Sequence, residues 1–302
     1  MCSSDLNGIE IPPLCYGQKM VITGAKKEVN SRTLVVKLDT NSCVKTKQRE
    51  KEAFFDSYSL NTEQAIDELA FRLFGFEKMR PFQHKILSRV LTGKSILAIA
   101  ATGSGKSECY ILPSMILGGV TIVVSPLKSL MQDQYEQRLD ERYGFGQLAA
   151  VINGDVPFST RQSILKKMEL GYYSLVFFTP EQLERSYILE SLKRTNQKAG
   201  IRYIAMDEAH CISQWGHDFR PSYLNIVKRL REYEIYPVKI ALTATASPKV
   251  REDICNELRI SEKEIDSGGD VYIESSNRPE INFIVKVVDS NSTKGEIGRA
   301  HV

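Results

Sequence analysis

The strongest constraint on the fold is a glycine-rich loop that directly follows a short apolar run. The run is Ser95-Ile-Leu-Ala-Ile-Ala100, and the chain continues as Ala100-Ala-Thr-Gly-Ser-Gly-Lys-Ser107 before a segment that can be helical. Strand, glycine loop and helix in this order are what a phosphate-binding loop requires. A flexible surface loop is the alternative interpretation, since Gly and Ser are common in turns. The context favours an α/β protein with a phosphate site at the end of a buried strand.

The polar groups of this loop suit the phosphates of a nucleotide. Gly103 and Gly105 let the backbone turn tightly and expose several N–H groups to phosphate oxygens at a helix N-terminus. We expect Lys106 to reach the β- and γ-phosphates and the Ser107 hydroxyl to bind Mg²⁺. The predicted nucleotide-binding residues of the loop are Thr102, Gly103, Ser104, Gly105, Lys106 and Ser107.

A second motif, Asp207-Glu-Ala-His210, follows the apolar run Ile201–Met206. We expect Asp207 to hold Mg²⁺ and Glu208 to orient and deprotonate an attacking water, and we count His210 with the catalytic residues. Adjacent carboxylates on a surface turn are the alternative, but ionised groups rarely end a buried strand without a partner. Because ligands collect at the carboxyl ends of strands in open α/β sheets, both motifs are predicted to face one crevice.

From residue 61 onward, helical periodicity alternates with short apolar runs, as a parallel sheet with helices on both faces requires. Right-handed crossovers are expected between the strands. Ser247 and Pro248 predict an N-cap and first turn of a helix that runs to about Leu258. The predicted strands are Ile96–Ala100, Thr121–Ser125, Leu148–Ile152, Leu175–Phe178, Ile201–Met206 and Val238–Thr243.

Composition excludes several classes of protein and selects none. The chain has 302 residues, of which 42% are hydrophobic and 25% charged, which is typical of a globular protein. No apolar run is long enough to span a bilayer. A net charge of +3 is too small to indicate nucleic acid by itself. The six cysteines show no Cys-x-x-Cys pair, so reduced thiols in a bacterial cytoplasm are expected, with no metal site.

The two ends of the chain carry an inverted repeat at the level of codons. Residues 1–6 can be encoded by GTG TGC TCT TCC GAT CTN, whose reverse complement reads Ile-Gly-Arg-Ala-His in frame, and the chain ends with that sequence before Val302. We therefore expect residues 1–6 and 296–302 to be adapter-derived rather than native, on a gene truncated at both sides. Residues 7–60, with a β-like run at 33–38 and a basic patch at 45–51, are expected to be the tail of an upstream domain.

Further segments match the motifs of a single family. They read Phe74-Gly-Phe-Glu-Lys-Met-Arg-Pro-Phe-Gln-His-Lys-Ile86, Ser125-Pro-Leu-Lys-Ser-Leu-Met-Gln-Asp-Gln134 and Ile212-Ser-Gln-Trp-Gly-His-Asp-Phe-Arg-Pro-Ser-Tyr223. With the two phosphate motifs, the chain from about residue 70 to 285 resembles the first motor domain of RecQ-family DNA helicases, in superfamily 2. This resemblance implies an α/β P-loop NTPase fold, with a RecA-like parallel sheet flanked by helices on both faces.

The resemblance assigns the nucleotide base to the segment that precedes the glycine loop. In the family an aromatic ring stacks on adenine while Arg and Gln read its edge, and these roles fall on Phe76, Arg80 and Gln83. Met79 and Phe82 replace the commoner Phe and Gly of the family. For Phe76, a position in the hydrophobic core is the alternative.

The resemblance also implies contacts with DNA. Family members contact DNA phosphates through loops that correspond to Ser125, Lys128 and Thr179, which positions the strand without reading its sequence. Trp215 and Phe219 would stack on bases of single-stranded DNA. The implied DNA-binding and coupling residues are Ser125, Lys128, Thr179, Trp215, His217, Phe219, Arg220, Thr243 and Thr245.

Within that set, the resemblance gives the remaining residues more specific roles. Arg220 would contact a phosphate or order the loop, and His217 would form a polar link. Thr243 and Thr245 belong to the Leu242–Ala246 motif, which couples hydrolysis to domain movement in superfamily 2. The alternative for Trp215 is a core position, which its polar neighbours make unfavourable.

The implied cofactors are ATP and Mg²⁺, and the implied partners are single-stranded and duplex DNA at the nucleoid, with no membrane. We expect residues 61–275 to form the first RecA-like domain and residues 276–295 to begin the second. In place of the family's Arg-Pro-Asn, the chain has Arg278-Pro-Glu280. Any zinc site would lie in a missing C-terminal part.

Within this framework, a full-length parent would unwind DNA from 3′ to 5′, whereas the truncated chain would bind ATP and DNA and turn over slowly. Two alternatives stay open. One is another superfamily 2 translocase, which would lack the Trp215 loop. The other is a non-catalytic nucleic-acid-binding fragment with a relic ATP site, against which the intact Lys106, Ser107, Asp207 and Glu208 argue.

Overall fold

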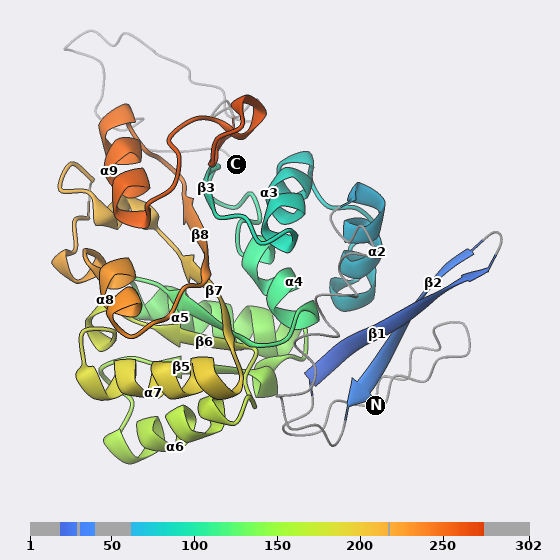
Figure 1. Cartoon of the computed structure of the whole chain (residues 1–302), viewed down its shortest axis with the longest axis horizontal. Coiled ribbons are helices and arrows are strands. Elements are labelled where there is room, and N and C mark those ends of the chain that lie inside the picture. The colour runs from blue at the N-terminus through green and yellow to red at the C-terminus, as the bar shows by residue number, and fades with distance from the viewer. Residues whose placement is uncertain (1–18, 29–30, 40–61, 217, 275–302) are drawn as a thin grey trace, which may run out of the picture.

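The main body of the protein is a seven-stranded sheet in the order β5-β6-β4-β7-β8-β3-β9 (Figure 1). The computed structural model describes residues 19–28, 31–39, 62–216 and 218–274. Every neighbouring pair in this sheet is parallel. The strands are β3 (Ile96–Ile99), β4 (Val120–Val124), β5 (Ala149–Ile152), β6 (Leu175–Phe178), β7 (Ile201–Met206), β8 (Val238–Thr243) and β9 (Val271–Ile273).

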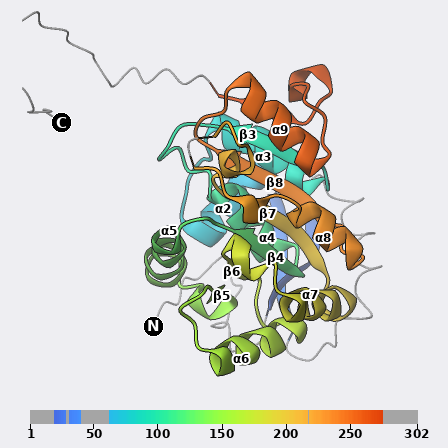
Figure 2. The ribbon, with the colours of Figure 1, turned by 90° about the vertical axis from the view of Figure 1, so that its left-hand side faces the viewer.

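Helices cover both faces of this sheet, which confirms the predicted fold class. One buried cluster joins one face of the sheet to α2 (Glu63–Phe74), α3 (Pro81–Leu91), α4 (Glu108–Ile116) and the π-helix η2 (Gln134–Arg142). The other cluster joins the opposite face to α6 (Phe158–Glu169), α7 (Ser186–Lys198), α8 (Ile226–Glu232) and α9 (Pro248–Leu258). The helices α6 and α7 run side by side next to β5 and β6 (Figure 2).

The strand predictions are confirmed, with boundary shifts of one residue in β3, β4 and β5. Strands that are buried on both faces appear in the sequence as continuous apolar runs, which makes them easy to recognise. The short edge strand β9 was not predicted. It pairs with β3 through Leu97 and Val271, so its strand geometry depends on the neighbour more than on its own pattern.

Local capping fixes the start of one helix and the end of another. At the start of α9 the Ser247 hydroxyl accepts a hydrogen bond from the Val250 amide at 3.3 Å, and Pro248 occupies the first turn, as predicted. The helix α2 ends at Gly75, whose φ of 73° is left-handed. The chain can therefore turn sharply there, towards the start of α3.

A second, two-stranded sheet precedes the main body in the sequence. The strands β1 (Lys19–Glu28) and β2 (Ser31–Asp39) pair antiparallel, and the predicted β-like run at 33–38 lies in β2. The basic patch at 45–51, residues 276–295 and both chain ends lie outside the described residues. In the part of the chain that the structure describes, no helix has the length and apolar character needed to cross a membrane.

Candidate functional site

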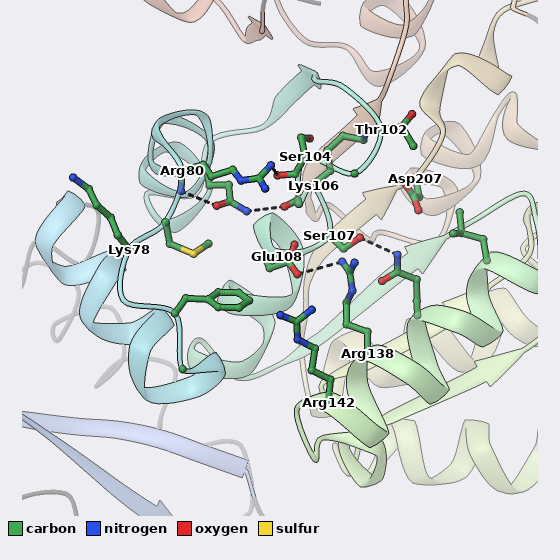
Figure 3. Close-up of a pocket in the computed structure, with 18 of the residues that line it drawn as sticks. Lys78, Arg80, Thr102, Ser104, Lys106, Ser107, Glu108, Arg138, Arg142 and Asp207 are labelled. Atoms are coloured by element: carbon green, nitrogen blue, oxygen red, sulfur yellow. Dashed lines mark hydrogen bonds and ion pairs between the residues drawn. The ribbon is translucent and has the colours of Figure 1, made fainter. Parts of the chain in front are cut away.

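The two sequence motifs meet at one edge of the sheet. The strand order β7-β8-β3 brings the glycine loop after β3 and the acidic motif after β7 to either side of the end of β8. A cavity of about 850 Å³ opens here, lined by the glycine loop, the segment before α3, η2, Asp207 and Glu208 (Figure 3). This arrangement confirms the prediction of a single crevice.

The glycine loop is wound as a phosphate-binding loop needs. Gly103 and Gly105 have φ angles of 75° and 93°, which residues with a Cβ rarely adopt. A Cβ on Gly105 would also lie 2.8 Å from Gln83 Nε2. The Lys106 ammonium folds across the loop and donates to the carbonyls of Ala100 at 2.8 Å and Ala101 at 3.0 Å. Burial lowers the pKa of Lys106, although the nearby Glu208 carboxylate opposes this effect.

The oxygens at the mouth of the loop fit a hydrated Mg²⁺ ion. The Ser107 hydroxyl accepts a hydrogen bond from Gln134 Nε2 at 3.0 Å. Asp207 is 7% exposed, and burial, followed by the Glu208 charge, raises its pKa to about 6. Among the described residues no cluster of three or more His, Cys, Asp or Glu could enclose a metal. One hydroxyl and one carboxylate, completed by phosphate oxygens and water, suit Mg²⁺, which keeps several waters when bound.

Several buried polar atoms around the cavity lack a hydrogen-bond partner in the described structure. They are Ser104 Oγ, Glu108 Oε2 and Gln134 Oε1. An unsatisfied buried polar atom costs about 1–3 kcal/mol, so a cluster of them indicates a site that a polar ligand completes. This fits a nucleotide with its metal and waters.

The acidic motif is strained and internally bonded. Glu208 has a φ of 49°, which for a residue with a side chain costs on the order of 1–3 kcal/mol and occurs mostly at functional sites. His210 Nδ1 lies 3.2 Å from Glu208 Oε2 and 3.0 Å from Thr243 Oγ1. The contact with His210 lowers the pKa of Glu208. Thr243 therefore links the threonine motif to the acidic motif, and its hydroxyl in turn donates to the Thr245 carbonyl at 3.0 Å.

The three residues predicted to bind the base lie together at the outer end of the cavity. Arg80 donates to the Ser104 carbonyl at 2.7 Å, and Gln83 donates to the Gly105 carbonyl at 2.8 Å. Gln83 also accepts from the Arg80 amide at 2.9 Å. Phe76 is half-buried, with the Arg142 guanidinium 5.4 Å from its ring centroid.

Among the residues that the sequence analysis missed are four that line this cavity or support its lining. Asp67 accepts from the Met79 amide at 2.8 Å and contacts His84 at 2.6 Å, which fixes the base-binding segment to α2. No local pattern marks Asp67. The other three lie on η2 at intervals of four residues, a spacing that could have revealed a shared face. They are Gln134, Arg138 and Arg142.

The predicted aromatic loop is exposed and well anchored. Trp215 is 73% exposed, which rules out a core position. Ser213 donates to Asp253 of α9 at 2.6 Å and accepts from the Trp215 amide at 3.1 Å. Arg220 lies 3.5 Å from the Glu181 carboxylate, so an ion pair orders the end of the loop. Phe219 is half-buried, and His217 lies outside the described residues.

The other predicted DNA contacts differ in accessibility. The side chain of Lys128 is half exposed, and its ammonium lies 2.7 and 2.9 Å from the two oxygens of Asp155. Ser125 and Thr179 are 2% and 4% exposed, so their hydroxyls do not face a strand laid on the surface. Their roles in DNA binding stay predictions.

Comparison with known proteins identifies the family. The DEAD/DEAH box helicase model matches residues 80–254. The chain is 33% identical over 235 residues to the ATP-dependent DNA helicase RecQ of Pasteurella multocida, covering 78% of this chain and 35% of that protein. It is 44% identical over 191 residues to RecQ of Bacillus subtilis, covering 63% of this chain and 31% of that protein.

A solved structure shares the fold. The DUF1998 helicase MrfA bound to DNA superposes with a TM-score of 0.52 at 20% identity, over 70% of this chain and 29% of that one. The chain spans about a third of the length of the two RecQ relatives. From the family match, the shared motifs and the RecA-like sheet, we conclude that this chain belongs to the DEAD/DEAH box helicase family, as a helicase domain homologous to RecQ.

Proposed function

We propose that this chain is the ATP-binding half of a DNA motor, whose full-length parent hydrolyses Mg·ATP, moves 3′ to 5′ along single-stranded DNA and separates duplex DNA. The observation that supports this proposal best is the continuity between Trp215 and the acidic motif. The buried segment 211–213 directly joins His210 to the exposed part of the loop. The Gly216 amide donates to the Ser213 carbonyl at 2.9 Å, and the Ser213 amide donates to the His210 carbonyl at 3.1 Å. A base stacked on Trp215 would thus act on a loop bonded to the catalytic segment.

The site supplies the groups that phosphoryl transfer to water needs. Lys106 is close enough to the phosphate cradle to leave its loop carbonyls and pair with phosphate oxygens. Ser107 and Asp207 would hold Mg²⁺, which when bound neutralises charge that develops on the phosphates. The lowered pKa of Glu208 keeps its carboxylate ionised near neutral pH, so that it can accept a proton from the attacking water.

DNA binding can affect Glu208 through two sets of hydrogen-bonded contacts. His210 connects Glu208 to Thr243, and the loop that carries Trp215 starts at the His210 carbonyl. Stacking on an exposed aromatic side chain contributes about 1–3 kcal/mol per base. A binding free energy of this size is enough to change the orientation of Glu208 relative to the attacking water. In this proposal Trp215 is the sensor and Glu208 the general base.

A second motor lobe is needed for fast turnover. In the family the second lobe supplies an arginine to the γ-phosphate, and such arginines contribute about 10³–10⁵ in rate. We propose that residues 61–275 form the first lobe and that residues 276–295 begin the second. The isolated chain would then bind Mg·ATP and hydrolyse it slowly.

The test is the ATPase rate of the full-length protein with and without single-stranded DNA. DNA should stimulate the unaltered protein, Trp215→Ala should lose the stimulation while still binding ATP, and Glu208→Gln should lose turnover. Tyr236→Ala is the matched control, since Tyr236 is an equally exposed aromatic residue, at 68%, outside the nucleotide cavity. If DNA does not change the ATPase rate, or if DNA still stimulates Trp215→Ala, a generic P-loop ATPase would be favoured instead.

A further inference from the structure

The π-helix η2 presents three polar side chains to the nucleotide cavity, one to each part of the site. Gln134 contacts Ser107 of the phosphate loop, Arg138 lies 3.2 Å from Glu108 of α4, and Arg142 covers the ring of Phe76. Figure 3 shows Arg138 and Arg142 pointing from this segment towards the cavity. π-Helical turns are rare and occur frequently at functional sites. None of these three side chains has a role in the chemistry proposed above.

Gln134 has the most specific contact, because its partner is the predicted metal ligand. Its Nε2 donates to Ser107 Oγ at 3.0 Å, while its Oε1 is buried without a partner among the described residues. A serine hydroxyl has one proton and two lone pairs. With one lone pair occupied by the Gln134 N–H, the direction of the other is restricted.

Both ends of this contact are held rigidly. Ser107 stands directly before the first residue of α4 and is 8% exposed. One turn beyond Gln134, Arg138 pairs with the buried Glu108 carboxylate, and further along the Tyr143 hydroxyl donates to the same carboxylate at 2.9 Å. The middle and the end of η2 are thus fastened to Glu108 of α4, which keeps Gln134 close to Ser107.

We infer that Gln134 is a positioning residue for the metal ion of this site. It orients the Ser107 hydroxyl so that a lone pair faces the ion, and its unpartnered Oε1 accepts a hydrogen bond from a water of the ion's hydration shell. This inference rests on the proposed function, since it assumes a nucleotide with Mg²⁺ at Ser107. Groups that orient metal ligands in this way typically change metal affinity about 10- to 100-fold when they are replaced.

The test measures binding of a fluorescent, non-hydrolysable ATP analogue to the 302-residue chain as MgCl₂ is varied. For Gln134→Leu we expect the Mg²⁺ concentration at half-maximal binding to rise about 10-fold, with unchanged affinity for the analogue in EDTA. Gln132→Leu is the matched control and should behave like the unaltered chain, because Gln132 is exposed and pairs with Glu136 away from the cavity.

A second variant and a double-mutant cycle separate positioning from packing. Gln134→Asn keeps the amide but is one methylene shorter. If the contact with Ser107 matters, this variant should also raise the Mg²⁺ concentration at half-maximal binding. In a Ser107→Ala background, Gln134→Leu should add little further change, because a residue that acts through Ser107 cannot act in its absence. Thermal unfolding without nucleotide verifies that each variant is folded.

The outcomes distinguish failure of the inference from failure of the proposed function. If the unaltered chain shows no Mg²⁺-dependent binding, or Lys106→Ala binds equally well, the proposed function fails. If that binding is present and Gln134→Leu leaves the Mg²⁺ requirement unchanged, Gln134 does not position the metal. An equal loss of affinity with Mg²⁺ and in EDTA also overturns the inference, since it assigns Gln134 a purely structural role.

Discussion

The Ser213 hydroxyl donates a 2.6 Å hydrogen bond to the Asp253 carboxylate, which ties the loop that carries Trp215 to α9. The helix α9 itself starts just after the Thr243–Thr245 segment, whose first residue contacts His210. The exposed loop is therefore anchored at two places, at the acidic motif and at α9. A loop held in this way can present Trp215 in one orientation without any packing of the indole.

Removal of the α9 anchor should loosen the loop. Asp253→Ala breaks a hydrogen bond to a charged acceptor, so we expect a loss of about 1–2 kcal/mol of stability and greater motion of Trp215. Trp215 is the only tryptophan in the chain, so its fluorescence anisotropy reports on this loop directly. Glu252→Ala is the control, because among the described residues Glu252 shares the Lys249 partner of Asp253 but has no contact with Ser213. An unchanged anisotropy in Asp253→Ala would show that the anchor does not order the loop.

How much of this molecule can be predicted from its sequence depends on how local each feature is. The strands β6, β7 and β8 were predicted with their observed boundaries, since each is a buried apolar run with its own sequence signal. Lys106 and Asp207 could be placed at the cavity for the same reason, since each belongs to a motif a few residues long. The edge strand β9 was missed because three residues are too few to show a hydrophobic periodicity. Its strand geometry comes from pairing with β3.

The contacts that orient the site are not local, and the sequence does not show them. Gln134 and Ser107 are 27 residues apart and lie on different elements, so their contact depends on how η2 packs against the start of α4. Asp67 precedes its partner Met79 by 12 residues and lies on a different element. Similarly, the sequence predicts Ser125 and Thr179 at strand ends but cannot show that the packing of β4 and β6 buries their hydroxyls.

Gly216 should not tolerate a side chain. A Cβ at this position would lie against the His210 carbonyl oxygen, far inside van der Waals contact. Because a backbone atom cannot move aside as a flexible side chain can, Gly216→Ala should cost about 1–3 kcal/mol and displace His210 from Thr243. Thermal unfolding and the DNA-stimulated ATPase rate of the full-length protein measure the two effects. Gly154→Ala serves as the control, with Lys128 Nζ at 3.8 Å as its nearest atom, and equal unfolding temperatures for the two variants would refute the prediction.

Asp67 should support nucleotide binding from outside the cavity. In Asp67→Ala the Met79 amide and the buried His84 lose their shared acceptor, which we expect to cost about 1–3 kcal/mol of stability. The Gly75–Arg80 segment would then hold Phe76 and Arg80 less firmly, so affinity for ATP should fall as well. Titration with a fluorescent ATP analogue measures this. The control is Glu68→Ala, which among the described residues removes a helix-surface pair with Arg72. Similar ATP affinities in both variants would contradict the expected role of Asp67.

Asp155 should weaken DNA binding by competing for Lys128. Its carboxylate holds the Lys128 ammonium as a DNA phosphate would, but both side chains are largely exposed, at 52% and 73%, so the pair contributes only about 0–1 kcal/mol. Asp155→Asn should therefore tighten binding of single-stranded DNA by a few-fold at most, whereas Lys128→Ala should weaken it. If Lys128 contacts one phosphate, its removal should also reduce the slope of log affinity against log salt by about 0.7.

Fluorescence titrations of Trp215 with oligonucleotides at several salt concentrations measure both quantities. Asp133→Asn makes the same change of charge on α5 (Lys128–Asp133). Asp133 forms no ion pair with Lys128 in the part of the chain that the structure describes, so this variant separates the local effect from the change in net charge. If Asp133→Asn and Asp155→Asn tighten binding of single-stranded DNA equally, net charge alone explains the change in affinity. An unaltered salt slope in Lys128→Ala would remove Lys128 from the DNA path, and the half-buried Arg220 would then be the basic residue to test next.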